Sequence, residues 1–153
     1  MKKIILAIAL CFAAISMNAQ DYNWAVGVRG GGMASGLTVK KVISDANAFE
    51  VNVNYWYNNG GILAGMYEWS TPVIAEGFNL YYGIGAHLGS GFSRKSDTDV
   101  ATFKIGADAV VGLEYKIPAA PIAISLDYRP FLNVIDSFDL GLYDVGLGLK
   151  FCF

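Results

Sequence analysis

Metal-binding and nucleophilic side chains are scarce in this sequence. Its 153 residues include one histidine, His87, and two cysteines, Cys11 and Cys152. These numbers exclude a zinc site with the usual cysteine and histidine spacing. The chain has 11 Lys and Arg against 13 Asp and Glu. With this balance and no basic cluster, a nucleic-acid partner is not expected.

Charge of either sign is also scarce. Charged residues make up 16% of the chain, against about 25% in an average domain. Glycine is abundant instead, at 18 residues, and the mean hydropathy is positive. A surface that faces water is rarely built this way, whereas a narrow lumen requires small side chains. The composition therefore favours a barrel with its apolar face outside.

The N-terminus is typical of a secretory signal peptide. Lys2 and Lys3 precede an apolar run, Ile4–Ile15, and the small, polar segment Ser16–Gln20 follows. The run is too short to cross a membrane as a helix. We therefore expect residues 1–20 to be a cleaved signal peptide.

The signal peptide could be cleaved after Ser16, Ala19 or Gln20. Residues 21–153 are expected to form one barrel domain. Lipidation of Cys11 is not expected, because Leu10 is large where lipoprotein signals have a small residue. The mature chain then keeps only Cys152, so an intramolecular disulfide is excluded.

The last stretch of the sequence shows the clearest alternation. Its period of two predicts a strand with one apolar and one polar face. Such a strand must leave an edge open or pair with the beginning of the chain, so we expect it to close a barrel against residues 23–32. The two faces are Tyr143, Val145, Leu147, Leu149, Phe151 and Phe153, and Asp144, Gly146, Gly148, Lys150 and Cys152.

Seven earlier segments are also predicted to be strands. Most have about the 9–11 residues that a tilted strand needs to cross a bilayer. The fold prediction is an all-β, eight-stranded, antiparallel, up-and-down transmembrane barrel. The segments are residues 23–32, 36–43, 49–57, 62–69, 78–88, 103–115 and 122–129, of which 62–69 alternates least clearly.

The connections are expected to alternate between the two sides of the membrane. With the N-terminus in the periplasm, the turns near Ser44, Thr71 and Pro118 are periplasmic. The outer loops then lie near Met33, Asn58, Gly89 and Phe131. The longest of them, residues 89–100, is rich in Gly, Ser and charge and is predicted to be an exposed loop.

The polar faces carry charges that would share the lumen. An eight-stranded barrel is just wide enough for side chains to fill it, and an unpaired buried charge costs several kcal/mol. We therefore predict that ion pairs plug the lumen and that there is no diffusion pore. The five positive and six negative candidates are Arg29, Lys40, Lys104, Arg129 and Lys150, and Glu50, Glu68, Asp108, Glu114, Asp127 and Asp144.

Together, the signal peptide, the two-faced strands and the final segment resemble the small outer-membrane β-barrel family of the OmpA and OmpX type. The ending Asn18-Ala19-Gln20 resembles those of exported Bacteroidetes proteins. The resemblance implies an outer-membrane location, with lipid and the barrel-assembly machinery as partners. It also implies an assembly signal formed by Leu147, Leu149, Phe151 and Phe153; Lys150 and Cys152 are not part of that match.

Such barrels include anchors, adhesins, resistance factors and lipid enzymes, so the fold does not define the activity. We favour a non-enzymatic barrel, structural or surface-interacting through its outer loops, with no cofactor and no defined surface partner. One alternative is a lipid-acting or proteolytic enzyme. The other is a soluble, secreted, lipocalin-like barrel with its apolar faces inward. The catalytic candidates are His87 as base, Ser90 or Ser93 as nucleophile, and Asp97 or Asp99 as the orienting group.

Overall fold

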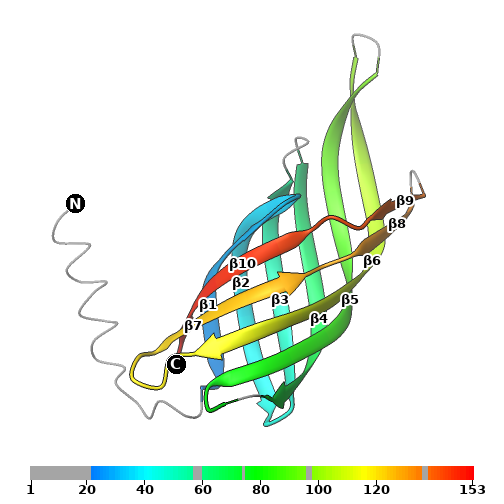
Figure 1. Ribbon diagram of the computed structural model, residues 1–153. Coiled ribbons are helices and arrows are strands. Elements are labelled where there is room, and N and C mark those ends of the chain that lie inside the picture. The colour runs from blue at the N-terminus through cyan, green and yellow to red at the C-terminus, as the bar shows by residue number, and fades with distance from the viewer. Residues whose placement is uncertain (1–21, 57–59, 74, 96–97, 136–137) are drawn as a thin grey trace, which may run out of the picture.

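The computed structural model describes residues 22–56, 60–73, 75–95, 98–135 and 138–153, and its strands form a closed antiparallel barrel (Figure 1). The predicted signal peptide lies outside these residues. In the described residues, no helix is long and apolar enough to cross a membrane. The strand segments are β1 (Trp24–Gly31), β2 (Ala34–Ser44), β3 (Asn47–Trp56), β4 (Gly60–Pro72), β5 (Phe78–Lys95), β6 (Thr98–Lys116), β7 (Ile122–Tyr128), β8 (Phe131–Ile135), β9 (Asp139–Gly141) and β10 (Val145–Cys152).

Eight strands make up the closed ring. Their order is β5-β4-β3-β2-β1-β10-β7-β6, and β6 pairs back to β5. The segments β8 and β9 pair with each other and prolong β7 and β10. Pro130 separates β7 from β8, since proline has no N–H for the ladder. The predicted eight-stranded architecture is therefore confirmed.

The first and last strands close the barrel as predicted. β1 pairs with β10 from Ala25 opposite Cys152 to Gly31 opposite Gly146. Beyond the ladder, Trp24 N donates to Phe153 O at 2.9 Å and Phe153 N donates to Trp24 O at 2.8 Å. The end of the barrel that carries these residues and the turn at residues 44–47 is called the inner end below, and the opposite end the outer end.

The extent of two predicted outer loops is wrong. Residues 89–100 belong largely to β5 and β6, which stay paired from Gly89 opposite Lys104 to Lys95 opposite Thr98. This hairpin rises well above its neighbours at the outer end (Figure 1). The second loop contains β8, which pairs with β6. Glycine and charge disfavour an apolar wall, but they do not prevent backbone pairing beyond it.

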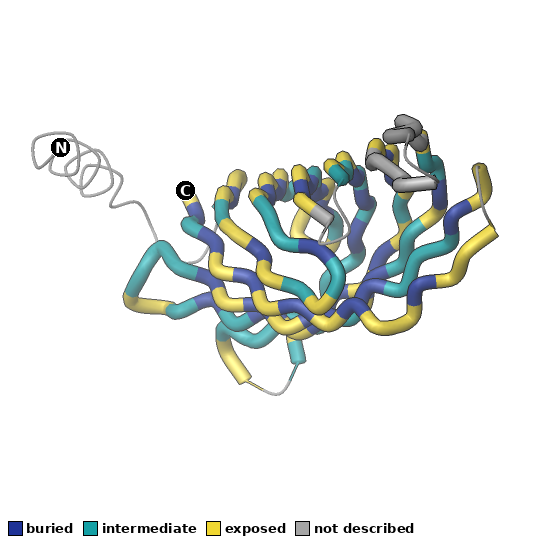
Figure 2. The backbone as a smooth tube through the Cα atoms, turned by 90° about the horizontal axis from the view of Figure 1, so that it is seen from above, coloured by how far each residue is buried: buried dark blue, intermediate teal, exposed yellow. Residues whose placement is uncertain are grey.

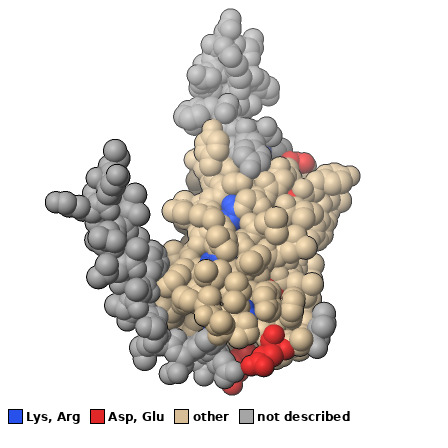
Figure 3. Space-filling view, turned by 60° about the vertical axis from the view of Figure 1, so that its left-hand side comes forward, with Lys and Arg blue, Asp and Glu red and all other residues tan. Residues whose placement is uncertain are grey.

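Buried and exposed residues alternate along the strands (Figure 2), because successive side chains of a strand point to opposite faces, here the lumen and the outside of the wall. On the outside, Val28 is 52% and Leu147 61% exposed, whereas the inward Thr38 and Asn52 are fully buried. The face drawn in Figure 3 carries few charged atoms on the wall, and acidic side chains gather at its lower end. The apolar faces therefore point outward, as predicted.

Aromatic side chains cluster on the outer surface near the inner end. Trp69 packs edge-on to Tyr67 and stacks on Tyr82, with ring centroids 5.0 and 5.8 Å apart. The Nζ atom of Lys41 lies 4.9 Å from the ring of Trp24, and its stem can cover apolar surface while the charge reaches the polar edge. This arrangement is typical of a membrane interface.

Candidate functional site

The candidate site is the lumen, where charged side chains from seven strands meet, together with Arg129 just after β7 and Asp144 just before β10. They face inward because each lies on the polar side of its alternating strand. Inward glycines leave room for them. At Gly146, for example, a Cβ atom would lie 2.5 Å from Cζ of Arg29.

Nine of the eleven predicted lumen residues form one continuous series of ion pairs, which we call the ion-pair network. It alternates in sign along its whole length and begins with Glu68, which faces Ala48 close to the inner turn. It ends with Asp144, whose Oδ1 accepts from the backbone N of Met33 at the outer end. In order, the pairs are Glu68–Lys40 (3.0 Å), Lys40–Glu114 (3.4 Å), Glu114–Lys150 (3.3 Å), Lys150–Glu50 (2.6 Å), Glu50–Arg129 (2.6 Å), Arg129–Asp127 (3.3 Å), Asp127–Arg29 (2.6 Å) and Arg29–Asp144 (3.0 Å).

Tyr81 lies at the centre of the ion-pair network and is fully buried. Its hydroxyl donates to Asp127 Oδ2 at 3.1 Å. The Nζ atoms of Lys40 and Lys150 lie 4.9 and 5.7 Å from its ring centroid, where the ring face attracts a cation. Sequence reasoning did not assign Tyr81 a role, although the alternation of β5 places it on the same face as Asn79 and His87.

Glu68, at one end of the ion-pair network, has fewer partners than Glu50 in its middle. Glu50 accepts from Asn52 as well as from Arg129 and Lys150. Among the described residues, Glu68 forms an ion pair with Lys40 alone, although both glutamates are fully buried. The network contains five carboxylates and four cations, and Glu68 is its least supported charge.

The other two predicted lumen charges lie elsewhere on the inward face of β6. Asp108 Oδ1 lies 2.9 Å from Nδ1 of His87, whose Nε2 lies 2.8 Å from Asn133 Oδ1. Lys104 is half-buried near the outer end. The histidine thus links β5, β6 and β8, a role that the sequence did not reveal because β8 was predicted to be a loop.

The structure does not bring Ser90 to His87, as the enzymatic alternative would require. His87 faces the lumen and is buried, whereas Ser90 is exposed on the opposite side of β5. Ser93 lies six residues along the strand, about 20 Å from His87 at 3.3 Å per residue. Asp97 lies outside the described residues, as do the side chains of Ser93 and Asp99.

The predicted assembly residues all lie on the outward face of the last strand. Leu147, Leu149 and Phe153 are 61%, 52% and 45% exposed, and Phe151 packs near Phe153 with ring centroids 6.2 Å apart. The neighbouring Lys150 and Cys152 are buried.

Among the described residues, no cluster of His, Cys, Asp or Glu could hold a metal ion.

Tyr22 lies across the inner end of the lumen. Its hydroxyl donates to Glu114 Oε1 at 2.7 Å, and Lys116 Nζ lies 5.8 Å from its ring centroid. Burial and the Glu114 carboxylate raise the pKa of Tyr22, so the hydroxyl stays protonated and keeps donating. The sequence did not single out this residue, because it precedes the first alternating segment.

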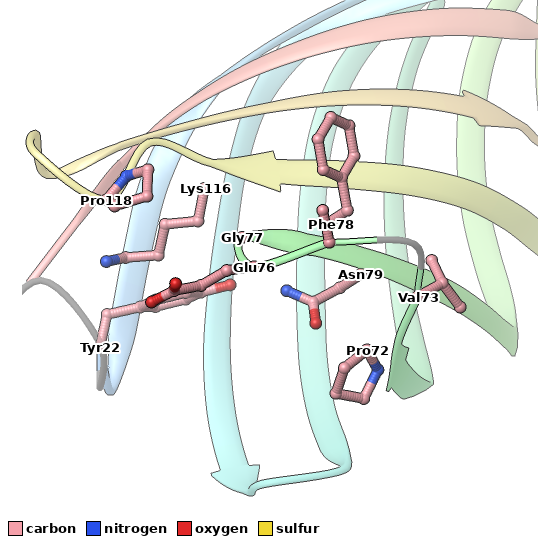
Figure 4. A pocket seen from close by; sticks show the side chains of 10 residues that line it. Tyr22, Pro72, Val73, Glu76, Gly77, Phe78, Asn79, Lys116 and Pro118 are labelled. Carbon is pink, nitrogen blue, oxygen red and sulfur yellow. The ribbon is translucent and has the colours of Figure 1, made fainter.

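Cavities lie on both sides of the ion-pair network. At the inner end, a cavity of about 520 Å³ (Figure 4) and a smaller one of about 180 Å³ have Tyr22 and Asn79 in common in their walls. Toward the outer end, a cavity of about 40 Å³ is lined by Arg29, Arg129 and His87, among others. The network lies between these two sets of cavities.

Comparison with known proteins identifies the fold. No family model and no curated protein matches the sequence. Among solved structures, the N-terminal β-barrel domain of OprF from Pseudomonas aeruginosa is similar, with a TM-score of 0.73. The chain has the fold of an OmpA-like outer-membrane barrel. The match covers 86% of this chain and 98% of the OprF domain at 14% identity, so it confirms the predicted fold alone.

Proposed function

We propose that this protein is an integral barrel of the bacterial outer membrane, neither an enzyme nor a general diffusion porin. It acts structurally or through the hairpins at its outer end. The observation that carries this proposal is the combination of an apolar outer wall with a lumen crossed by the ion-pair network. Lipid contacts the outer wall, and the barrel-assembly machinery is the partner of the protein during its insertion.

The outer wall supports a membrane location. Its exposed side chains are mainly Leu, Val, Ile and aromatic residues, which would be unfavourable in contact with water over so large a continuous area. The alternative of a soluble, lipocalin-like barrel requires the apolar faces to be inside. The lumen instead holds buried Lys, Arg, Asp and Glu, which contradicts that alternative.

The ion-pair network supports a closed lumen. A hydrated ion passing through would have to separate pairs that are almost fully buried, such as Lys150–Glu50 at 2.6 Å. Removing a partner from a buried pair typically costs about 3–5 kcal/mol. Several such pairs in series are a large barrier to steady conduction.

The surroundings of the histidine support a non-enzymatic role. Both ring nitrogens of His87 already lie within hydrogen-bonding distance of Asp108 and Asn133. A general base needs a free nitrogen within reach of the proton that it removes.

The β5–β6 hairpin is the tallest at the outer end (Figure 1). It is therefore the element best placed to meet a surface partner.

Cell fractionation combined with gel mobility tests this proposal. We expect the protein to appear in the outer membrane, to resist alkaline extraction, and to migrate faster on SDS gels unheated than boiled. Folded barrels keep their compact form in SDS because their strand ladder has no open edge. Recovery as a soluble periplasmic protein would contradict the proposal.

A further inference from the structure

The outer side of the lumen contains a small cavity above the ion-pair network. Its volume is about 40 Å³, which is enough for a group of a few non-hydrogen atoms, because a single water molecule needs about 10–15 Å³. Met33, Ile62 and Phe131 lie in its wall and are partly exposed. The cavity therefore reaches toward the outer end of the barrel.

Asn54 presents an unused hydrogen-bond acceptor to this cavity. It lies in the cavity wall and is only 9% exposed. Its Oδ1 atom is buried, and no group of the described residues donates to it. Gly36 faces Asn54 across β2 and β3, and a Cβ atom at Gly36 would lie 2.7 Å from this oxygen. Because a buried amide oxygen without a partner is unfavourable, we expect a donor opposite it.

Asp108 presents a second acceptor together with a negative charge. It lines the same cavity, and its Oδ1 lies 2.9 Å from Nδ1 of His87. Its Oδ2 is buried and accepts no hydrogen bond from the described part of the chain. The histidine thus fixes one oxygen of the carboxylate, and the other remains for a ligand. An ionised carboxylate accepts hydrogen bonds at both oxygens.

The two arginines in the cavity wall already face carboxylates. Arg29 donates to Asp127 and to Asp144, each at 3.0 Å. Arg129 donates to Glu50 at 2.6 Å, and its Nε lies 3.3 Å from Asp127 Oδ1. The eleven lumen candidates comprise five positive and six negative side chains. One added positive charge would balance them, so the arginines do not exclude a cation from this cavity.

We propose that this cavity binds the ammonium end of an aliphatic primary amine. The ammonium donates one hydrogen bond to Asn54 Oδ1 and one to Asp108 Oδ2, and the aliphatic stem leaves past Met33, Ile62 and Phe131. An ammonium has three N–H donors and no acceptor, which matches two unused acceptors beside a negative charge. A calcium ion fits less well, because it takes about six to eight oxygen ligands. The inference goes beyond the proposed function, since it adds a ligand to the closed lumen.

An NMR titration of the folded full-length protein in detergent micelles tests the inference. The probe is n-butylammonium chloride, and the control is n-butyltrimethylammonium chloride, which keeps the charge and the stem but has no N–H donor. We expect saturable shifts of the backbone amide signals of Asn54, Ala64 and Asp108 with the probe. Binding of the control should be weaker by about tenfold or more, because it forms no hydrogen bonds. Equal binding of the two cations, or shifts that do not saturate, would overturn the inference.

Four variants show which residues form the site. Asn54→Leu and Asp108→Asn should each weaken binding about tenfold, because each removes an acceptor or the charge that strengthens its hydrogen bond. Asn79→Leu changes an asparagine at the inner end and should bind like the wild type. Ala64→Leu fills the cavity from its wall and should abolish binding while the gel-mobility shift shows a folded barrel.

Unchanged affinity in folded Asn54→Leu or Asp108→Asn would refute the site, as would retained binding in folded Ala64→Leu. Competition distinguishes an ammonium from a metal ion. We expect an excess of potassium chloride, at constant ionic strength, not to displace the bound butylammonium. If potassium displaces it, the cavity takes any small cation and the inference of ammonium recognition is wrong.

Discussion

Glu50 and Glu68 are equally buried but differ in their partners, which makes them a matched pair. Glu50 contacts Arg129 and Lys150, each at 2.6 Å. Glu50→Gln should lower the free energy of unfolding by about 3 kcal/mol, because two buried cations lose their shortest partner. The measurement is urea unfolding of the vesicle-embedded barrel, followed by tryptophan fluorescence.

Glu68→Gln is the control for this prediction. The ion-pair network has one more carboxylate than cations, and Lys40 keeps Glu114 at 3.4 Å. We expect a change within about 1 kcal/mol, since the lost attraction is offset by a smaller desolvation cost. Equal losses in the two variants would show that the middle of the network is not its main support.

At this scale the sequence predicted which residues face the lumen but not which residues pair. Alternation placed the eleven lumen candidates inward and left Lys41 on the outer face, because a period of two assigns a face to every position. Pairing across the lumen depends on how far each strand is staggered against the others. Arg29 and Asp127, for instance, are 98 positions apart and lie on strands that flank β10.

The last strand is the element that closes the ring, and its outward aromatic end gives a second prediction. Phe153→Ala should reduce the amount of folded protein in the outer membrane severalfold, because the family resemblance makes this side chain part of the assembly signal. The backbone bonds between Phe153 and Trp24 do not depend on the side chain. Quantified membrane fractions on unheated gels provide the measurement.

Phe49→Ala is the matched control for the last strand. Phe49 is 43% exposed on the outer wall and Phe153 45%, so both substitutions remove similar lipid contact. Only the change at Phe153 alters the end of the closing strand. If both variants insert equally well, or equally poorly, Phe153 has no special role in assembly.

Element boundaries were predicted well where apolar contrast was strong and poorly where it was weak. The segment 62–69, chosen mainly to give an even number of strands, is part of the 13-residue β4. The outer parts of β5 and β6 were assigned to a loop because Gly, Ser and charged residues dominate them. Hairpin pairing needs only the backbone, so composition alone does not mark where such strands end.

For the whole molecule, alternation alone left open which face is outside. The low charge and high glycine content favoured an apolar outer wall, and the burial of each strand agrees with that choice. The cavities at the two ends and the contacts of Tyr22 and Tyr81 could not be predicted. They arise from strand stagger and from the chain preceding β1, neither of which leaves a periodic signal.

Conductance through a planar lipid bilayer tests the central claim most directly, which is that the ion-pair network closes the lumen. After insertion of the folded protein, verified by its gel-mobility shift, we expect no steady conductance above the bare bilayer. A 16-stranded porin recorded in the same bilayer serves as the positive control, because barrels of that size hold an aqueous channel. Large, stable conductance steps from this protein would contradict the account.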